Sequence, residues 1–291
     1  MTITANRFEE TIAGYAATVD AHTAWTVLDL STGNREQVRG GDPVPVGDLD
    51  SLVWYLALSD AHSRGEIDLS AACTLEQRYR SDGNRGVIGC MSDGLELTLG
   101  DFLSQTVITG DPAAFAAVAE AVGAQGASSA AIVDRFLRLQ GAGGLGGRPQ
   151  LSAAGRSGVA IGSTTTNEQV DLLRQLVEQA GAGSGEHSGR AQRSLTVLGS
   201  VLKAGGLGRG LPGYGPFRTK VAHVARGGNG NSATVRNDAA IFFDNGSPRV
   251  IVSASVSEIP LWQGAVPGIA IAEDFLMNVS RAAWLQSTGR N

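Results

Sequence analysis

The residues best suited to chemistry in this sequence are three charged side chains at the ends of predicted elements. Asp50 opens an apolar helix, Asp111 directly precedes another, and Arg226 ends a strand. Carboxylates partly withdrawn from water acquire raised pKa values and can pass protons, and an arginine can bind a carboxylate or a developing oxyanion. If these three side chains line one cleft, they could support noncovalent acid–base chemistry, such as an isomerisation, cyclisation, elimination or hydration, that requires neither a metal nor an organic cofactor.

Each of these positions also has a purely structural interpretation. An aspartate at the start of a helix accepts free backbone N–H groups and is stabilised by the helix dipole by about 0.3–1 kcal/mol. Asp48, with Ser51 three residues later, fits that capping role best. The alternative for Arg226 is a solvated strand end before the sequence GGNGN. His223 falls on the other face of the same strand, where a structural histidine is the favoured interpretation.

Hydrophobic periodicity predicts strands at both ends of the chain and helices between them. We expect an opening helix at residues 8–22, followed by a buried strand at 24–30 that pairs with residues 36–39. Helical periodicity then continues from residue 48 to about residue 202, with helices from residue 48 and at 98–108, 112–122 and 128–139. Strands are expected at 219–226, 232–243 and 249–256, and an apolar helix at 268–284.

Two glycine-dense segments interrupt the helical part of the chain. The first, residues 141–162, leads into STTTNEQVDLLRQL, where Thr164 or Thr165 can cap the next helix. Glu168 completes a capping box if Thr165 is the cap. The second segment, residues 181–189, is predicted to be an exposed loop.

This order of elements predicts an α+β fold. A mostly antiparallel sheet made from both termini would be flanked by the terminal helices, with an all-helical subdomain inserted between the two groups of strands. We expect residues 1–46 and 206–291 to form the sheet subdomain and residues 47–205 the helical subdomain. A ligand cleft would then lie between them.

The segment VGDLDSLVWYLALSDAHSRGEIDL, residues 46–69, resembles the first active-site helix of class A β-lactamases and penicillin-binding proteins. In that family a nucleophilic serine, two spacer residues and a lysine open an apolar helix. In this frame Gly47 replaces the serine and Asp50 replaces the lysine, so the resemblance implies that Asp50 points into the cleft. Ser51 followed by Trp54 has the same spacing but no amine to take the proton. Hydrolysis through an acyl-serine at this site is therefore excluded.

The segment LTLGDFLSQTVITGDPAAFAAVAEAVG resembles the part of the family that carries an S-D-N triplet, which here reads Gly110, Asp111, Pro112. The family's aspartate is mainly a buried structural residue, so its retention indicates fold more than function. Pro112 suits the first turn of a helix but offers no hydrogen bond to a substrate. Thr109 is another hydroxyl at this position, without an evident base.

Two more family motifs are replaced. RPQLSAAGRSGVAIGSTTTN resembles the omega loop that carries the deacylating glutamate, yet residues 141–167 contain no Asp or Glu. Gln150 is the nearest candidate, and an amide cannot take a proton from water near neutral pH. GLGRGLPGYGPFRTKVAHVARGG resembles the strand bearing K-T-G, which here reads Val224, Ala225, Arg226.

The resemblance extends from Trp25 to Trp284 and implies a class A β-lactamase-like fold. The cleft would carry Asp50, Asp111 and Arg226 as the catalytic set. Its ligand contacts would be Gly47, Asp48, Trp54, Tyr55, Thr109, Gly110, Gln150 and Val224. We predict a scaffold repurposed for acid–base chemistry on a small organic molecule, of the kind found in biosynthetic pathways. The alternatives are a catalytically inert pseudoenzyme that binds a small ligand or a protein partner, and a residual hydrolase that uses another nucleophile.

Composition limits the partners and the location. The net charge of −5 and pI of about 5.4 provide no basic stripe for a nucleic acid. The first twenty residues lack a secretory signal and no apolar run approaches the roughly 20 residues of a membrane helix. We therefore expect a cytoplasmic protein without membrane contact, unlike β-lactamases of the resembling class. Cys73 and Cys90 are expected to be free thiols, and neither has the C-x-x-C spacing of a zinc site.

Overall fold

Five antiparallel strands form the central sheet of the computed structural model, which describes residues 5–46, 49–80, 86–140, 163–201, 206–211, 221–224 and 235–289. The strand order β2-β1-β9-β8-β7 places the C-terminal β9 beside the N-terminal β1, so both ends of the chain build one sheet. The strands are β1 (His22–Asp29), β2 (Arg35–Val38), β7 (Val221–Val224), β8 (Val235–Asp244) and β9 (Ser247–Ser257).

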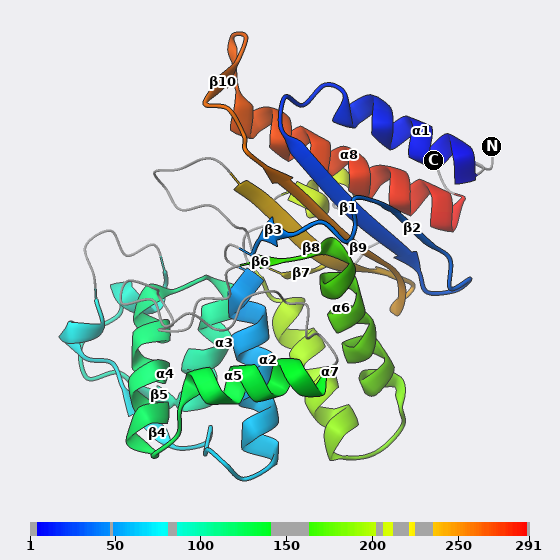
Figure 1. Cartoon of the computed structure of the whole chain (residues 1–291). Helices are drawn as coiled ribbons and strands as arrows, with labels where there is room; N and C mark the ends of the chain where they lie inside the picture. Colours follow the sequence, from blue (N-terminus) through cyan, green and yellow to red (C-terminus); the bar gives the residue numbers. More distant parts are fainter. Residues whose placement is uncertain are drawn as a thin grey trace.

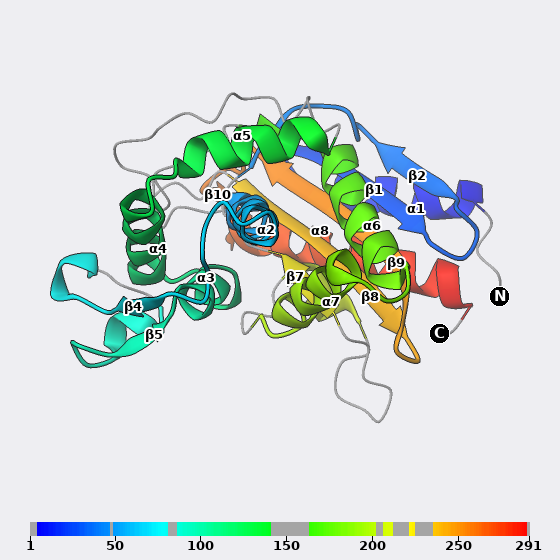
Figure 2. The ribbon, with the colours of Figure 1, turned by 90° about the horizontal axis from the view of Figure 1, so that it is seen from below.

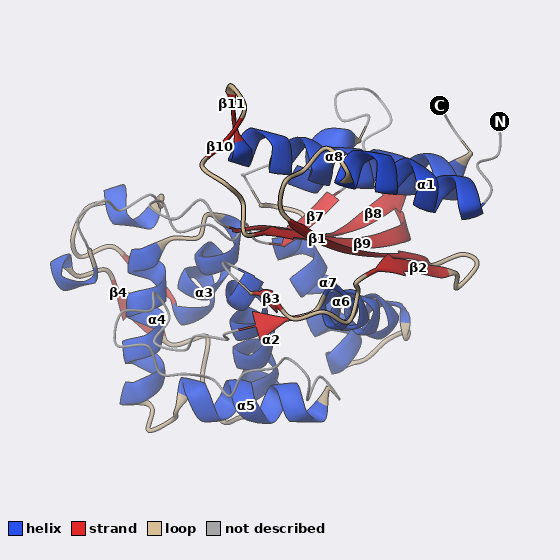
Figure 3. Cartoon of the chain, turned by 45° about the horizontal axis from the view of Figure 1, so that its top comes forward, coloured by secondary structure: helices blue, strands red, loops and turns tan. Residues whose placement is uncertain are grey.

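Helices α1 (Ala5–Ala16) and α8 (Gly268–Thr288) cover one face of this sheet, and the remaining helices lie on the side of the opposite face (Figures 1 and 3). Successive side chains of a strand alternate between the two faces. Phe242 and Val252 accordingly join the core beneath α1 and α8, whereas Ile241 and Ile251 join the core on the helical side. The predicted α+β architecture, with an antiparallel sheet from both termini, is confirmed.

The helical part is arranged around α2 (Asp50–Ser63), which Figure 2 shows end-on. Nine of its fourteen side chains are buried, because it carries apolar residues on every side. The helices around it are α3 (Leu99–Ile108), α4 (Pro112–Ala124), α5 (Ser129–Leu139), α6 (Thr166–Gly181) and α7 (Glu186–Leu198).

Side-chain caps fix where several of these helices begin. The Thr165 side chain accepts the backbone N–H of Glu168, and the Glu168 carboxylate accepts that of Thr165, which confirms the predicted capping box of α6. Thr98 forms a second capping box with Asp101 at the start of α3. Pro112 occupies the first turn of α4, as predicted.

Three segments differ from the sequence prediction. The opening helix ends at Ala16, because β1 already starts at His22, where it pairs with β9. Residues 186–189, predicted to be a loop, form the first turn of α7. Short pairings were also missed, and they are β3 (Val44–Pro45) with β6 (Ser163–Thr164), β4 (Ala72–Thr74) with β5 (Glu96–Thr98), and β10 (Trp262–Gln263) with β11 (Val266–Pro267).

The cysteines lie in the segment between α2 and α4 and are free thiols, as predicted. Cys73 is in β4 and Cys90 ends the 3-10 turn η3 (Ile88–Cys90). Two further 3-10 turns are η2 (Gln77–Tyr79) and η4 (Gly206–Gly210). In the described part of the chain no single helix has the length and apolar composition needed to cross a membrane. Helices α4 and α5 meet these two requirements only when taken together, and the pair is bent by 94°.

A polar layer joins α6 to the sheet. The hydroxyls of Thr26 in β1 and Thr166 in α6 are 2.8 Å apart, and Ser253 of β9 donates to Oε1 of Gln169 at 2.6 Å. These side chains are buried, so their hydrogen bonds specify one position of the helix over the strands. Although α6 lies in the predicted helical subdomain, it packs directly on the sheet, and one hydrophobic core includes residues from both parts.

Glu36 of β2 provides a test of packing at the sheet edge. Burial raises the pKa of this carboxyl group, Glu9 acts in the same direction, and hydrogen bonds from Gln286 and Asn34 partly oppose them. An acid with a raised folded-state pKa lowers stability once pH exceeds its unfolded value. We therefore expect Glu36→Gln to raise the thermal midpoint at pH 7, with the gain disappearing below about pH 4.

Thermal unfolding followed by circular dichroism across this pH range measures the effect. Glu96→Gln, at an exposed position of β5, is the matched control and should show no such pH-dependent gain. A Glu36→Gln protein less stable than the parent at pH 7 would contradict the conclusion that burial of the ionised Glu36 carboxylate lowers the stability of the fold.

Candidate functional site

The first turn of α2 is the centre of the site expected from the sequence. The helix begins at Asp50, which is half-buried, and the preceding Leu49 provides no side-chain cap. Ser51 is 4% exposed and Trp54, three residues later, is 2% exposed. An indole cannot accept a proton from a hydroxyl. The structure therefore places no base for Ser51 at the position where the Ser-x-x-Lys spacing would require one.

An aromatic contact brings the start of α4 beside the start of α2. The rings of Trp54 and Phe115 stack with centroids 5.2 Å apart and an interplanar angle of 30°. Trp54 is four residues into α2 and Phe115 three residues into α4, so each lies about one helical turn from its N-terminus. This contact brings the turn of Asp50 and the segment containing Gly110 and Asp111 into one region.

Asp111 is fully engaged by the backbone. Its Oδ1 accepts the N–H groups of Ala113 and Ala114 at 2.9 and 3.2 Å, and its Oδ2 accepts those of Ile88 and Gly89 at 2.6 and 3.3 Å. The side chain is 0% exposed. A carboxylate that caps α4 and holds η3 at the same time has a structural role. The contacts therefore correct the expectation that Asp111 is a catalytic residue facing a ligand.

Two glycines fit this segment for different reasons. A Cβ at Gly86 would lie 1.9 Å from Oδ2 of Asp111, so only glycine allows the chain to pass so close to the carboxylate. Gly110 has φ +64°, a left-handed conformation that favours glycine, but a Cβ there would meet no atom within 4 Å. As far as the described residues go, open space therefore adjoins Gly110. Its neighbour Thr109 is 6% exposed and donates its hydroxyl to the Gln105 carbonyl at 3.0 Å.

The sheet reaches the same region through β8. The side-chain amide of Asn237 donates to the carbonyl of Pro45, in the segment that leads into α2, and its oxygen accepts the hydroxyl of Ser255. Ala239, two residues along the same face of β8, is in register with Val224 of the edge strand β7. The stacking of Trp54 on Phe115 links the first turn of α2 to the Thr109–Asp111 segment, and the bond from Asn237 links the approach to α2 to β8 and its partner β7. We call the first turn of α2, the Thr109–Asp111 segment and the end of β7 the junction site.

Apart from Asp111, the predicted catalytic and contact residues divide into four groups. Gly47, Asp48, Gln150 and Arg226 lie outside the described residues, and Val224 is placed by its backbone register alone. Asp50, Thr109 and Gly110 belong to the junction site. Trp54 and Tyr55 do not line it, because Trp54 is buried in the core and the Tyr55 hydroxyl bonds Ser194 and Ser59 on the flank of α2. Burial of the phenol raises the pKa of Tyr55.

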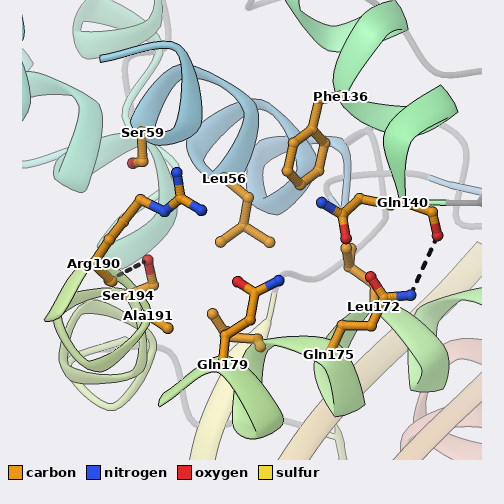
Figure 4. A pocket seen from close by; sticks show the side chains of 11 residues that line it. Leu56, Ser59, Phe136, Gln140, Leu172, Gln175, Gln179, Arg190, Ala191 and Ser194 are labelled. Atoms are coloured by element: carbon orange, nitrogen blue, oxygen red, sulfur yellow. Dashed lines mark hydrogen bonds between the residues drawn. The ribbon is translucent and has the colours of Figure 1, made fainter. Parts of the chain in front are cut away.

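A separate pocket lies on that flank, between α2, α5, α6 and α7 (Figure 4). Sequence reasoning missed it. Its apolar wall consists of Leu56, Phe136, Leu172, Leu176 and Ala191, and its polar groups come from Ser59, Gln140, Gln175, Gln179, Arg190 and Ser194. The one signal in the sequence was the helical stripe of α2 that contains Tyr55, Leu56 and Ser59. Arg190 was hidden because residues 181–189 were interpreted as a loop.

The described residues do not gather three or more His, Cys, Asp or Glu side chains as metal ligands. Lysine is also scarce in the sequence, which has only Lys203 and Lys220. Both lie outside the described residues. A serine on α2 thus has no lysine on its own helix.

Comparison with known families and structures identifies what the chain is similar to. Residues 6–284 match the model of the Beta-lactamase enzyme family. Three solved structures with similar folds are a β-lactamase from Sphaerobacter thermophilus (20% identity, TM-score 0.74, covering 99% of this chain and 98% of that one), a β-lactamase from Chitinophaga pinensis (17%, 0.75, 96% and 98%) and a mutant of PBP-A as its acyl-enzyme complex with penicillin G (15%, 0.72, 98% and 97%). No curated protein sequence matches.

The structural role of Asp111 predicts a large effect of Asp111→Asn. An asparagine can present one oxygen to the donors of Asp111, but its NH₂ group then faces two backbone N–H groups. We expect a loss of about 3 kcal/mol in the free energy of unfolding, measured by urea denaturation. Thr98→Ala, which removes the exposed cap of α3, should cost about 1 kcal/mol. If Asp111→Asn lowers the free energy of unfolding by no more than Thr98→Ala does, the structural role given to Asp111 is wrong.

Proposed function

This chain belongs to the β-lactamase enzyme family, and we propose that it acts on a small organic molecule by noncovalent acid–base chemistry at the junction site. The observation that carries the proposal is the composition of α2. No lysine occurs in the first 202 residues, and Ser51 is followed at the required spacing by a buried tryptophan. The amine that a Ser-x-x-Lys pair supplies to activate its serine is therefore missing from α2. On this ground we assign the site chemistry that proceeds without an acyl-serine intermediate.

Asp50 is the group to which we assign proton transfer. It is half-buried in the first turn of α2, the helix whose Trp54 stacks on Phe115 of α4. A carboxylate at the start of a helix is held by the helix dipole, which keeps it available as an acceptor of protons. We assign Arg226 the binding of an anionic group on the ligand. Reactions in biosynthetic pathways, such as cyclisation, isomerisation, elimination or hydration, suit this pair.

A second candidate function is a pseudoenzyme that binds a small ligand without turnover. The contacts of Asp111 favour it, because its four backbone N–H partners remove one of the two carboxylates expected to act together. A site with one remaining carboxylate can still bind a polar ligand. It also retains one group for proton transfer, so the two functions are separated by measurement of turnover.

Substitution Asp50→Asn tests the enzymatic proposal. The protein is incubated with a bacterial metabolite extract, and mass spectrometry follows compounds that are consumed and compounds that appear. We expect wild-type protein to convert a metabolite into a product, and Asp50→Asn to slow that conversion by about 10²–10⁴-fold, the usual contribution of a general acid or base. Glu120→Gln, an exposed position of α4, is the control and should leave the rate unchanged.

Arg226→Ala provides the complementary variant. Because Arg226 is assigned to binding of the ligand, its loss should raise KM more than it lowers kcat. Metabolites retained on the protein without any product would favour the pseudoenzyme. Product formation at an unchanged rate by Asp50→Asn would refute the assignment of proton transfer to Asp50.

A further inference from the structure

Three of the seven large apolar side chains that are exposed in the described part of the chain lie on one short hairpin, formed by β10 and β11. Leu261 is 74% exposed, Trp262 58% and Val266 46%. The other tryptophans of the sequence, at positions 25, 54 and 284, are at most 6% exposed. Apolar surface gathered in one place marks an interaction site, whereas single scattered residues do not.

Contacts at its base hold the hairpin in one position. The side-chain amide of Gln263 accepts the backbone N–H of Asp20 at 3.0 Å and donates to the carbonyl of Thr18 at 2.7 Å, so it is clamped to the connection between α1 and β1. A Cβ at Gly268 would lie 2.0 Å from the carbonyl oxygen of Pro260, so glycine allows the start of α8 to pass against the hairpin. A preformed hairpin loses little conformational freedom when it docks.

The hairpin projects beyond the body of the molecule, at the end of the sheet where α8 begins (Figures 1 and 3). Gln263 and Val266 pair across a two-residue turn, in which Gly264 takes φ +61° without strain. The tip is therefore narrow and convex. Exposed side chains on such a tip are best buried by a pocket that encloses them.

The hairpin itself is uncharged, and exposed acids border it. No charged residue or histidine occurs between Glu258 and Glu273. Glu258 and Asp274 are exposed near the two ends of this run, and Asp20 is exposed where the hairpin is clamped. Glu273 pairs with Arg236 at 3.3 Å, whereas no ion pair with a described residue engages the other three acids. The described surface around the tip is therefore negative.

This charge disfavours two of the occupants that an apolar tip can have. In a two-fold dimer the same surface faces itself, so the acids of one copy would meet those of the other. Anionic lipid headgroups would be repelled in the same way. Three partly exposed side chains also provide less apolar surface than one myristoyl chain, which binds membranes only marginally.

A second copy also offers no suitable pocket on the flank of α2. The pocket that the described residues form there has a volume of about 20 Å³, which holds a water or two and not an indole. A pocket on a different protein, bordered by lysines or arginines, matches both the convex shape and the acids. Because a standard interface buries about 800 Å² on each partner, three side chains are its anchor and not its whole contact.

We propose that the β10–β11 hairpin is a docking element that inserts Leu261, Trp262 and Val266 into an apolar pocket of a different protein, with basic side chains at its border. Trp262 is the anchor, because tryptophan at the centre of an interface contributes most to affinity. Asp20 and Glu258 face the basic border. The hairpin is separate from the junction site, so the proposal is independent of the reaction assigned there.

Photo-crosslinking from the tip identifies the partner. A photoreactive amino acid replaces Ala265, the exposed turn residue, in the full chain, which is irradiated in a lysate of the organism that encodes it. Mass spectrometry identifies the attached protein, which is then purified and titrated against the wild-type chain by calorimetry. We expect one protein that binds saturably in pure form. Absence of a light-dependent adduct, or of binding by the purified protein, would overturn the proposal.

Substitutions on the hairpin test the anchor. Trp262→Ala should weaken binding of the purified partner at least about thirtyfold, and Leu261→Ser about fivefold. Leu139→Ser, at a 67% exposed leucine that ends α5, is the matched control and should bind as the parent does. Circular dichroism checks that each variant folds, and the second hairpin variant keeps the test decisive if the first does not. Parent affinity in a folded hairpin variant would refute the docking element.

Salt dependence tests the basic border of the pocket. Binding of the parent should weaken as salt is raised, and Asp20→Asn should slow association and reduce this dependence. Glu96→Gln, at an exposed position of β5, is the control for loss of one negative charge and should behave as the parent does. An affinity that does not change with salt would contradict the proposed border.

Fluorescence of Trp262 distinguishes the other occupants, because the remaining tryptophans are buried. Iodide quenching is measured on the chain alone at low and high concentration, and with phosphatidylcholine vesicles that contain or lack phosphatidylglycerol. We expect the same quenching in all of these conditions. Protection of Trp262 at high protein concentration would indicate a second copy, and protection by vesicles would indicate a lipid surface. Either result would overturn the proposal.

Discussion

The carboxylate of Asp111 is the interaction on which the arrangement of the helical part depends. It accepts four backbone N–H groups, two that begin α4 and two from η3, more than twenty residues earlier in the chain. Buried donors left without acceptors would cost about 1–3 kcal/mol each. This one side chain therefore determines where α4 begins and how close the preceding segment approaches it. The same contacts commit Asp111 to structure, so the chemistry proposed for the junction site uses other groups.

The sheet positions the other side of the junction site through buried polar contacts. Thr26 meets Thr166, Ser253 donates to Gln169, and Asn237 holds the carbonyl of Pro45 ahead of α2. Such contacts specify one relative placement, because a displaced partner would leave a buried polar group without a hydrogen bond. The architecture of the β-lactamase enzyme family is thereby kept while the residues at the start of α2 differ from a serine–lysine pair. Retention of the scaffold does not require retention of the chemistry.

Local sequence signals predicted much of the fold. The spacing of Thr165 and Glu168 predicted the start of α6, because a capping box involves only four residues. The partners of Asp111 could not be predicted, since Ile88 and Gly89 reach it through the tertiary fold. Trp54 was expected to line a cleft, but its stacking on Phe115 depends on how two helices pack. The pocket beside Arg190 was missed because four helices from separate parts of the sequence form it.

Intact-protein mass spectrometry after incubation with penicillin G measures the central claim most directly. Penicillin G is the compound held as an acyl-enzyme by the related PBP-A mutant. The account predicts that this chain keeps its unmodified mass throughout, because no serine on α2 has a lysine on its own helix to activate it. A stoichiometric adduct of penicilloyl mass, mapped by peptide analysis to Ser51 or to another hydroxyl of the junction site, would contradict it.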